Sequence, residues 1–215
     1  MSEAITATGM VLSAAPIGEN DKRVVILTRE LGKISAFARG ARRPGSTLMA
    51  ASNPLATGSF SLIQGRNSYN LIHTDISEYF TEMAMEYPGI YYAYYFLDFA
   101  GYYGREGLDG TEMLNLLYLS IKALLNPKID DRLVRRIFEL RLITMNGEYA
   151  PEAGTLSEAA LYVIDYVCTQ PLTKLYTFTV TEEVLRELER TMDRHTKKIL
   201  DYPLKSRKIL EDMLQ

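Results

Sequence analysis

The sequence predicts an α+β protein in which a small five-stranded barrel is followed by a bundle of helices. Up to about Phe80, short runs show the two-residue period of half-buried strands, and beyond it apolar residues recur at the helical spacing of three and four. The charge changes at the same point, from a balance of +2 over residues 1–80 to −5 over residues 81–215. We therefore expect two domains, at residues 1–80 and 81–215.

Five strands account for the first domain. They are expected at Ile5–Ala14, Val24–Thr28, Ile34–Arg39, Thr57–Gln64 and Tyr69–Thr74. Gly32 can take the positive φ that a hairpin between the second and third strands needs, and residues 65–68 form another turn. A short helix at Ser46–Ser52, capped by Ser46, is expected between the third and fourth strands. This is the layout of an OB-fold, a partly open barrel that commonly binds single strands.

Helical periodicity and capping residues define the second domain. The first expected helix covers residues 88–103. The second is capped by Thr111 and stopped by Pro127, and the third is capped by Asp130 or Asp131 and ends at Gly147. The remaining three are Ser157–Cys168, a helix capped by Thr181, and Lys205–Leu214. A short strand is expected at Leu175–Val180. The first of these helices is rich in tyrosine and apolar on nearly every side, which is typical of the centre of a bundle, with a stacking or partner surface as the alternative.

The composition favours a reduced compartment. The chain has one cysteine, Cys168, so an internal disulfide cannot form and a cytoplasmic location is expected. The first residues lack the basic and apolar regions of a signal peptide. The longest apolar run, Gly89–Tyr103, is shorter than the roughly 20 residues of a membrane span, so we expect a buried helix there.

The segment from Lys22 to Arg43 concentrates positive charge in a chain of net charge −3. Seven of its 22 residues are basic and one, Glu30, is acidic, a local balance of +6. Such a cluster is the footprint of phosphate binding, with a solvated basic face as the alternative. The candidate DNA contacts are Lys22, Arg23, Arg29, Lys33, Arg39, Arg42, Arg43 and, in a later turn, Arg66. Phe37, Phe60 and Tyr69 are candidates for stacking on bases, with Phe60 and Tyr69 in the barrel core as the alternative.

A second candidate surface lies in the helical domain. The spacing of Arg132, Arg135 and Arg136 places them on one helical face, beside apolar Leu133, Ile137 and Leu140. A basic rim next to an apolar groove suits a short peptide with acidic and aromatic residues at a free C-terminus. A solvated face paired with Glu139 is the alternative.

Patterns for catalysis and metal binding are missing from the sequence. It has neither a P-loop nor a paired-glycine dinucleotide pattern, and His73, His195 and Cys168 cannot supply the usual Cys/His set of a structural zinc site. Cys168 lies in an apolar helix and is expected to be a buried, inert thiol. His195 lies on an apolar stripe and is expected to be a packed residue rather than a base. We expect no enzyme activity, no cofactor and no metal.

Several short motifs, in order along nearly the whole chain, resemble the RecO family of bacterial recombination mediators. The N-terminal ones are Gly9-Met-Val-Leu, Arg23-Val-Val-Ile-Leu-Thr-Arg-Glu-Leu-Gly-Lys, Ala38-Arg-Gly-Ala-Arg and Ser46-Thr-Leu. The later ones are Phe138-Glu-Leu-Arg-Leu, Tyr149-Ala-Pro-Glu and Pro203-Leu-Lys-Ser-Arg-Lys.

The resemblance implies an OB-fold followed by a helical domain, without enzymatic turnover. It implies a nucleoid-associated protein that binds single- and double-stranded DNA and anneals complementary strands. It also implies help in loading the recombinase RecA onto DNA coated by single-strand-binding protein, together with RecR. Docking of the C-terminal tail of single-strand-binding protein on the Arg132, Arg135 and Arg136 face is our own inference from charge and spacing.

One departure from the family pattern concerns zinc. Many members carry two Cys-x-x-Cys pairs after the Tyr-Ala-Pro-Glu segment, whereas here that segment runs directly into Gly154-Thr-Leu-Ser. The zinc module is therefore expected to be missing. Because OB-folds carry many functions, an adaptor that binds peptides or RNA without a DNA role remains the alternative, and an enzyme with a split active site is a third interpretation.

Overall fold

A computed structural model describes residues 3–150 and 156–214. The chain divides into two compact units. One contains the residues up to Ala84 together with Leu97–Leu114, and the other contains Met85–Phe96 together with the chain from Asn115 onward. The domain boundary at residue 80 stays a prediction.

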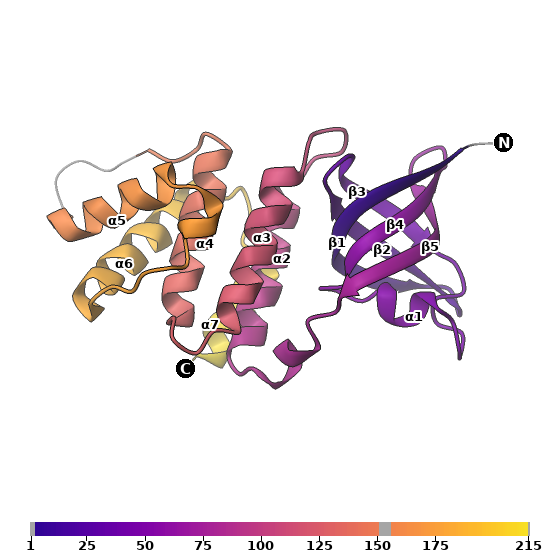
Figure 1. The fold of residues 1–215 in the computed structure, drawn as a ribbon, viewed down its shortest axis with the longest axis horizontal. Coiled ribbons are helices and arrows are strands. Elements are labelled where there is room, and N and C mark those ends of the chain that lie inside the picture. The colour runs from indigo at the N-terminus through magenta and orange to yellow at the C-terminus, as the bar shows by residue number, and fades with distance from the viewer. Residues whose placement is uncertain (1–2, 151–155, 215) are drawn as a thin grey trace. The chain divides into compact units, whose positions relative to one another are not determined.

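The first unit contains a closed five-stranded barrel (Figure 1). Its strands are β1 (Ala4–Ile17), β2 (Asp21–Thr28), β3 (Gly32–Ala38), β4 (Thr57–Gln64) and β5 (Tyr69–Glu78). They follow one another around the barrel in the order β1-β2-β3-β5-β4, and every pairing is antiparallel except that of β3 with β5. This confirms the predicted OB-fold class. Strand β1 is longer than predicted, because Pro16 and Ile17 continue to pair with β2 instead of entering the turn.

The barrel core follows from strict alternation. In β3, Ile34, Ala36 and Ala38 are buried while Ser35 and Phe37 between them are half-buried. The short helix α1 (Leu48–Ala51) adds Leu48 to the same core. The Ser46 hydroxyl accepts a bond from the Leu48 N–H at 3.3 Å, but Thr47 occupies the N-cap position, so the predicted cap is displaced by one residue.

The tip of the β2–β3 hairpin requires a glycine. Gly32 has φ of +67°, and a Cβ there would collide with the Arg105 carbonyl oxygen. Gly32 also pairs with Glu106, and the Lys33 N–H donates to the Arg105 oxygen at 3.0 Å. The segment Leu97–Leu114 is thereby tied to the barrel within the first unit.

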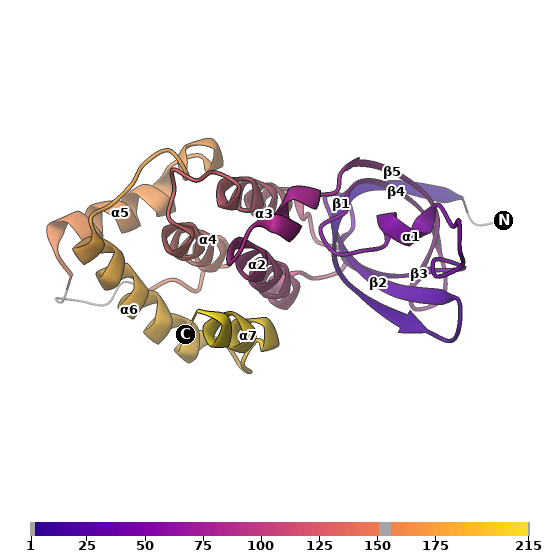
Figure 2. The same cartoon turned by 90° about the horizontal axis from the view of Figure 1, so that it is seen from below.

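Seven α-helices are found in the described chain, and six follow the barrel. They are α2 (Gly89–Tyr103), α3 (Thr111–Leu124), α4 (Asp131–Met145), α5 (Glu158–Thr169), α6 (Glu182–Ile199) and α7 (Lys205–Met213), with 3₁₀ turns η1 (Thr81–Met85) and η2 (Leu172–Lys174). Helices α4, α5 and α6 pack against one another (Figure 2). Each of these helices is too short or too polar, in the part of the chain that the structure describes, to cross a membrane.

Local capping signals predicted most helix starts. The side chains of Asp130, Ser157 and Thr181 accept bonds from the first turns of α4, α5 and α6, as expected. Thr111 does not cap α3, because it is already helical and its N–H donates to the Asp109 carboxylate at 2.7 Å.

The tyrosine-rich helix α2 is a core element, as predicted. Tyr92, Tyr95, Phe96 and Phe99 are fully buried, and the Phe96 ring stacks on Phe138 of α4 with centroids 4.3 Å apart.

The predicted strand at Leu175–Val180 is wrong. After η2 the chain there runs without strand pairing among the described residues. Its residues have strand propensity, but strand structure also needs a neighbouring edge to pair with.

Candidate nucleic-acid interface

The basic residues of the hairpin lie at two ends of the barrel rather than on one face. The β2–β3 register runs from Lys22 opposite Ala38 to Thr28 opposite Gly32. Those six residue steps correspond to about 20 Å at the usual rise of a strand. Lys22, Arg23, Arg39, Arg42 and Arg43 therefore belong to one end, which we call the basic end, and Arg29 and Lys33 belong to the other. The single cluster that the sequence suggested is thus corrected to two groups.

At the hairpin tip, Lys33 has a structural contact instead of an open position. Its Nζ donates to the Gly101 carbonyl oxygen at 2.5 Å, near the end of α2. Burial, and then the nearby Arg105, lower the pKa of Lys33. The neighbouring backbone of Arg29 is also bonded, to Thr8 and Gly110. This end of the hairpin therefore holds residues 101–110 against the barrel.

Arg66 lies apart from the basic end. It is exposed in the turn between β4 and β5. Because β5 runs parallel to β3 with Tyr69 opposite Ala36, the turn before Tyr69 lies on the side of the hairpin tip.

A tight turn presents three arginines at the basic end. The Gly40 N–H donates to the Asp21 carboxylate at 2.7 Å. Arg42 donates its backbone N–H to the Asn20 carbonyl oxygen and its Nη1 to the Gly18 carbonyl oxygen, at 2.8 and 3.0 Å. Arg39, Arg42 and Arg43 are exposed, and no salt bridge joins them to a carboxylate of the described residues. Their charge is therefore available to a partner.

Lys22 is tied more closely to the protein than the three arginines. Lys22 is two residues before buried Val24, so its side chain starts on the same side of the strand. Its Nζ donates to the Met49 carbonyl oxygen at 3.2 Å and to Asn53 Oδ1 at 2.7 Å. Burial, and then the charge of Arg42, lower the pKa of Lys22. It fixes α1 at this end of the barrel and adds positive potential there.

One row of side chains crosses the outside of the barrel beside these arginines. Arg23 of β2 is opposite Phe37 of β3, and Phe37 is opposite Asn70 of β5. The row faces outward, because its neighbours along the strands are buried or, at Lys22, half-buried. Arg23 Nε donates to the Ser35 hydroxyl at 2.8 Å, which holds the guanidinium along the strands. A cation, an aromatic ring and an amide in one row can contact a phosphate, a base face and a base edge.

The structure separates the three predicted stacking residues. Phe60 is fully buried and Tyr69 is 6% exposed, both in the barrel core, so they are not stacking residues. Only Phe37 lies on the outer surface. Sequence reasoning missed Asn70, because the β3–β5 pairing that brings it beside Phe37 leaves no local signal.

The predicted arginine face of α4 is not an exposed surface. Arg135 and Arg136 are only 4% and 5% exposed, and Leu133 and Leu140 are also buried. Both arginines bind the buried Glu139 carboxylate, at 2.8 and 2.9 Å. Arg132 is the exception, since it is partly exposed and paired with Asp130 and Glu182. The expected basic rim beside an apolar groove is corrected to an internal ion-pair network.

The residues considered for metal binding or catalysis are dispersed. No group of three potential metal-binding side chains occurs among the described residues. His195 is packed, as predicted, at 6% exposure, with Nε2 3.1 Å from the Glu148 carbonyl oxygen. Cys168 is half-buried, and its Sγ lies 3.4 Å from the Thr144 hydroxyl.

Comparison with known proteins agrees with this fold. Residues 1–80 match the family described as Recombination protein O N terminal. A protein named DNA repair protein RecO from Acetivibrio thermocellus is 27% identical over 232 residues, covering 92% of each chain. The protein of that name from Alkaliphilus metalliredigens is 33% identical over 143 residues, covering 66% of this chain and 58% of the relative. The chain is therefore similar to RecO proteins in its barrel and over most of its length.

This similarity to RecO proteins supports a role in DNA repair and recombination. A third relative, DNA repair protein RecO from Exiguobacterium sibiricum, is 24% identical and covers 97% of this chain. The similarity to RecO proteins therefore extends over the helices as well as the barrel. The segment that matches the RecO N-terminal family contains the basic end and the row of Arg23, Phe37 and Asn70.

Proposed function

We propose that this chain acts as a RecO-type protein, which binds DNA at the basic end of its barrel and brings complementary strands together. The observation that carries the proposal is the arrangement of Arg39, Arg42 and Arg43 on one turn, exposed and without salt bridges to the described residues. A chain of net charge −3 does not attract DNA as a whole, so a local patch has to supply the affinity.

The neighbouring row defines how a single strand would lie. Phosphates contact the arginines of the turn and Arg23, while a base stacks on Phe37 and meets the Asn70 amide. Duplex DNA keeps its bases stacked inside the helix, so it engages the same arginines through phosphates alone. Both forms bind, and phosphate contacts make the binding largely independent of sequence.

Annealing follows from charge neutralisation. Two complementary strands repel each other, and a protein that covers phosphates on one strand lowers the barrier to pairing with the next. By resemblance to RecO proteins, the chain would act near the nucleoid with RecR and assist RecA indirectly on DNA coated by single-strand-binding protein. It would do so without catalytic turnover. The tail of single-strand-binding protein remains a proposed partner, but its docking site is not the buried face of α4.

The test combines a double variant with a control of equal charge change. Replacing Arg39 and Arg43 by Ala removes two exposed charges and keeps the Arg42 contacts that hold the turn. Two lost phosphate contacts should weaken binding of a labelled oligothymidylate by roughly 20-fold near 0.1 M salt. Annealing of complementary oligonucleotides should slow in parallel. The control variant replaces Lys197 and Lys198, two exposed residues of α6, by Ala, and it should leave oligothymidylate binding and annealing unchanged. Normal annealing by the Arg39 and Arg43 variant would move the DNA site elsewhere.

A further inference from the structure

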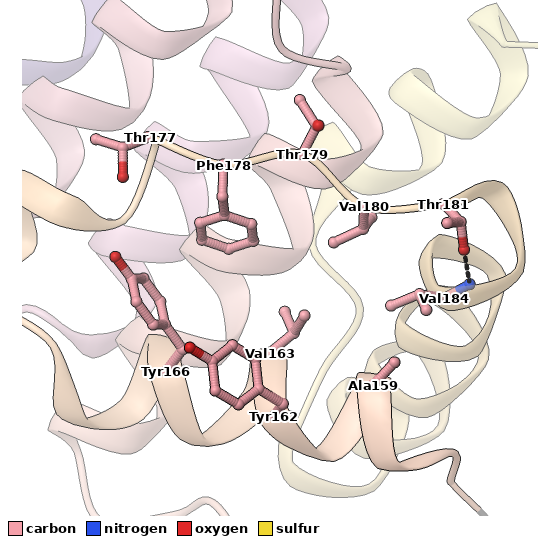
Figure 3. A pocket seen from close by; sticks show the side chains of 10 residues that line it. All are labelled: Ala159, Tyr162, Val163, Tyr166, Thr177, Phe178, Thr179, Val180, Thr181 and Val184. Carbon is pink, nitrogen blue, oxygen red and sulfur yellow. Dashed lines mark hydrogen bonds between the residues drawn. The ribbon is translucent and has the colours of Figure 1, made fainter.

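An aromatic groove lies between α5 and the extended segment that precedes α6 (Figure 3). Its volume is about 520 Å³. Figure 3 shows Phe178 pointing from the extended segment toward Tyr162 and Tyr166 of α5. The Tyr166 and Phe178 rings meet edge to face with centroids 5.2 Å apart, and Tyr162 is 70% exposed. The groove is thus walled by rings and open to solvent along Tyr162.

The extended segment has the character of an unpaired strand. Its sequence, Thr177-Phe-Thr-Val-Thr181, alternates, with Phe178 and Val180 half-buried and the threonines exposed. The N–H and C=O groups of residues 178–180 make no backbone hydrogen bond within the described chain. Such an edge can pair with an added strand, because backbone groups that leave water need new partners.

Three exposed acids, which we call the acidic rim, are sequence neighbours of residues that line the groove. Glu158 and Asp165 of α5 lie on the same helical face as exposed Leu161 and Tyr162. Glu183 lies at the start of α6, and none of the three acids has a salt bridge within the described residues. This charge repels a phosphate backbone and attracts cations, so it argues against a second nucleic-acid site.

We propose that the aromatic groove binds an extended segment of a partner protein in which apolar and basic residues alternate. The segment adds a strand along residues 178–180, in the mode by which peptides extend a free sheet edge. Its apolar side chains enter between the rings of Tyr162, Tyr166 and Phe178, and its basic side chains face Glu158 and Asp165. The proposal is independent of DNA binding, since it uses no residue of the basic end.

The test uses three designed peptides and the full chain. A labelled, capped peptide of sequence Lys-Phe-Lys-Val-Lys-Phe should bind, measured by fluorescence anisotropy. A version with Glu in place of each Lys should bind at least about 10-fold more weakly, because it meets an acidic rim. A version methylated on alternate backbone nitrogens should lose binding similarly, because it cannot pair as a strand.

Two substitutions place the binding in the groove. Tyr162→Ser removes an exposed ring and should weaken the first peptide at least about fivefold, within the range expected for a rim aromatic. Tyr94→Ser, at a tyrosine of α2 that is 45% exposed and outside the groove, is the matched control. DNA binding by the Tyr162→Ser variant should match that of the wild type, so a failure here is distinguishable from a failure of the DNA proposal.

Three outcomes would overturn the proposal. One is no binding of the first peptide, and another is equal binding of all three peptides, which would mean unspecific apolar contact. The third is self-association of the wild-type chain in sedimentation that Tyr162→Ser abolishes, which would assign the groove to a second copy of the chain.

Discussion

In the proposed interface, Phe37 is the residue that would distinguish a single-strand site from a general phosphate site. It is the one predicted stacking residue that the barrel places outside, in register with Arg23 and Asn70. Phe60 and Tyr69 are also aromatic, but their positions in the strand alternation place their side chains in the barrel core. The pattern of alternation predicts which residues share a face, and only the closed barrel decides which face is inside.

Replacing Phe37 by Leu tests this role. Leucine keeps apolar contacts on the sheet surface but offers no ring for a base, so single-strand affinity should fall by about 1 kcal/mol, or roughly fivefold. Duplex affinity should stay nearly constant, because the arginines are untouched. Binding of both DNA forms measured side by side, with thermal unfolding as the folding control, decides the matter. A parallel loss for both forms would show that Phe37 supports the fold and does not stack.

At the scale of elements, helix α4 is held by a buried charge network. Glu139 is fully buried and accepts bonds from Arg135, Arg136 and the Tyr95 hydroxyl, at 2.8, 2.9 and 2.7 Å. The Asp193 carboxylate of α6 accepts hydrogen bonds from Arg136 at 2.9 Å and from Arg207 of α7 at 3.0 Å. Burial alone would raise the pKa of Glu139, but Arg136 and Arg135 outweigh it and lower the pKa to about 2. The carboxylate is therefore ionised inside the protein.

Replacing Glu139 by Gln should reduce the free energy of unfolding by about 3 kcal/mol, because it removes the one fully buried carboxylate that pairs with both Arg135 and Arg136 and leaves them, among the described residues, only the partly exposed Asp193 and Glu211. The stability that Glu139 provides is present above pH 4.5, its ordinary pKa, and is lost as the pH falls toward about 2. Urea unfolding should therefore show a steeper loss below pH 4.5 for the wild type than for the variant. Glu182→Gln, at an exposed acid paired with Arg132, should change stability far less. Equal effects of the two substitutions would contradict the stabilising role of the buried charge network.

At the scale of the whole molecule, local signals predicted the elements and missed what depends on long-range pairing. Caps such as Asp130 and Ser157 act within one turn, so they can be seen in the sequence. The separation of Lys33 from Arg39 depends on strand register and on contacts with residues 101–110. The spacing of Arg132, Arg135 and Arg136 predicted one exposed face, but it could not show that acids of α6 and α7 pair with Arg135 and Arg136, which are buried.

The salt dependence of single-strand binding tests the central claim most directly, because each phosphate contact contributes a fixed part of the slope. The affinity of wild type and of the Arg39→Ala, Arg43→Ala variant for one oligothymidylate should be measured over about 50–300 mM salt, with Lys197→Ala, Lys198→Ala as control. Loss of two contacts should make the slope of log affinity against log salt less steep by about 1.4, at roughly 0.7 per phosphate. The control should keep the wild-type slope. A folded double variant whose slope equals that of the wild type would contradict the assignment of DNA binding to the basic end of the barrel.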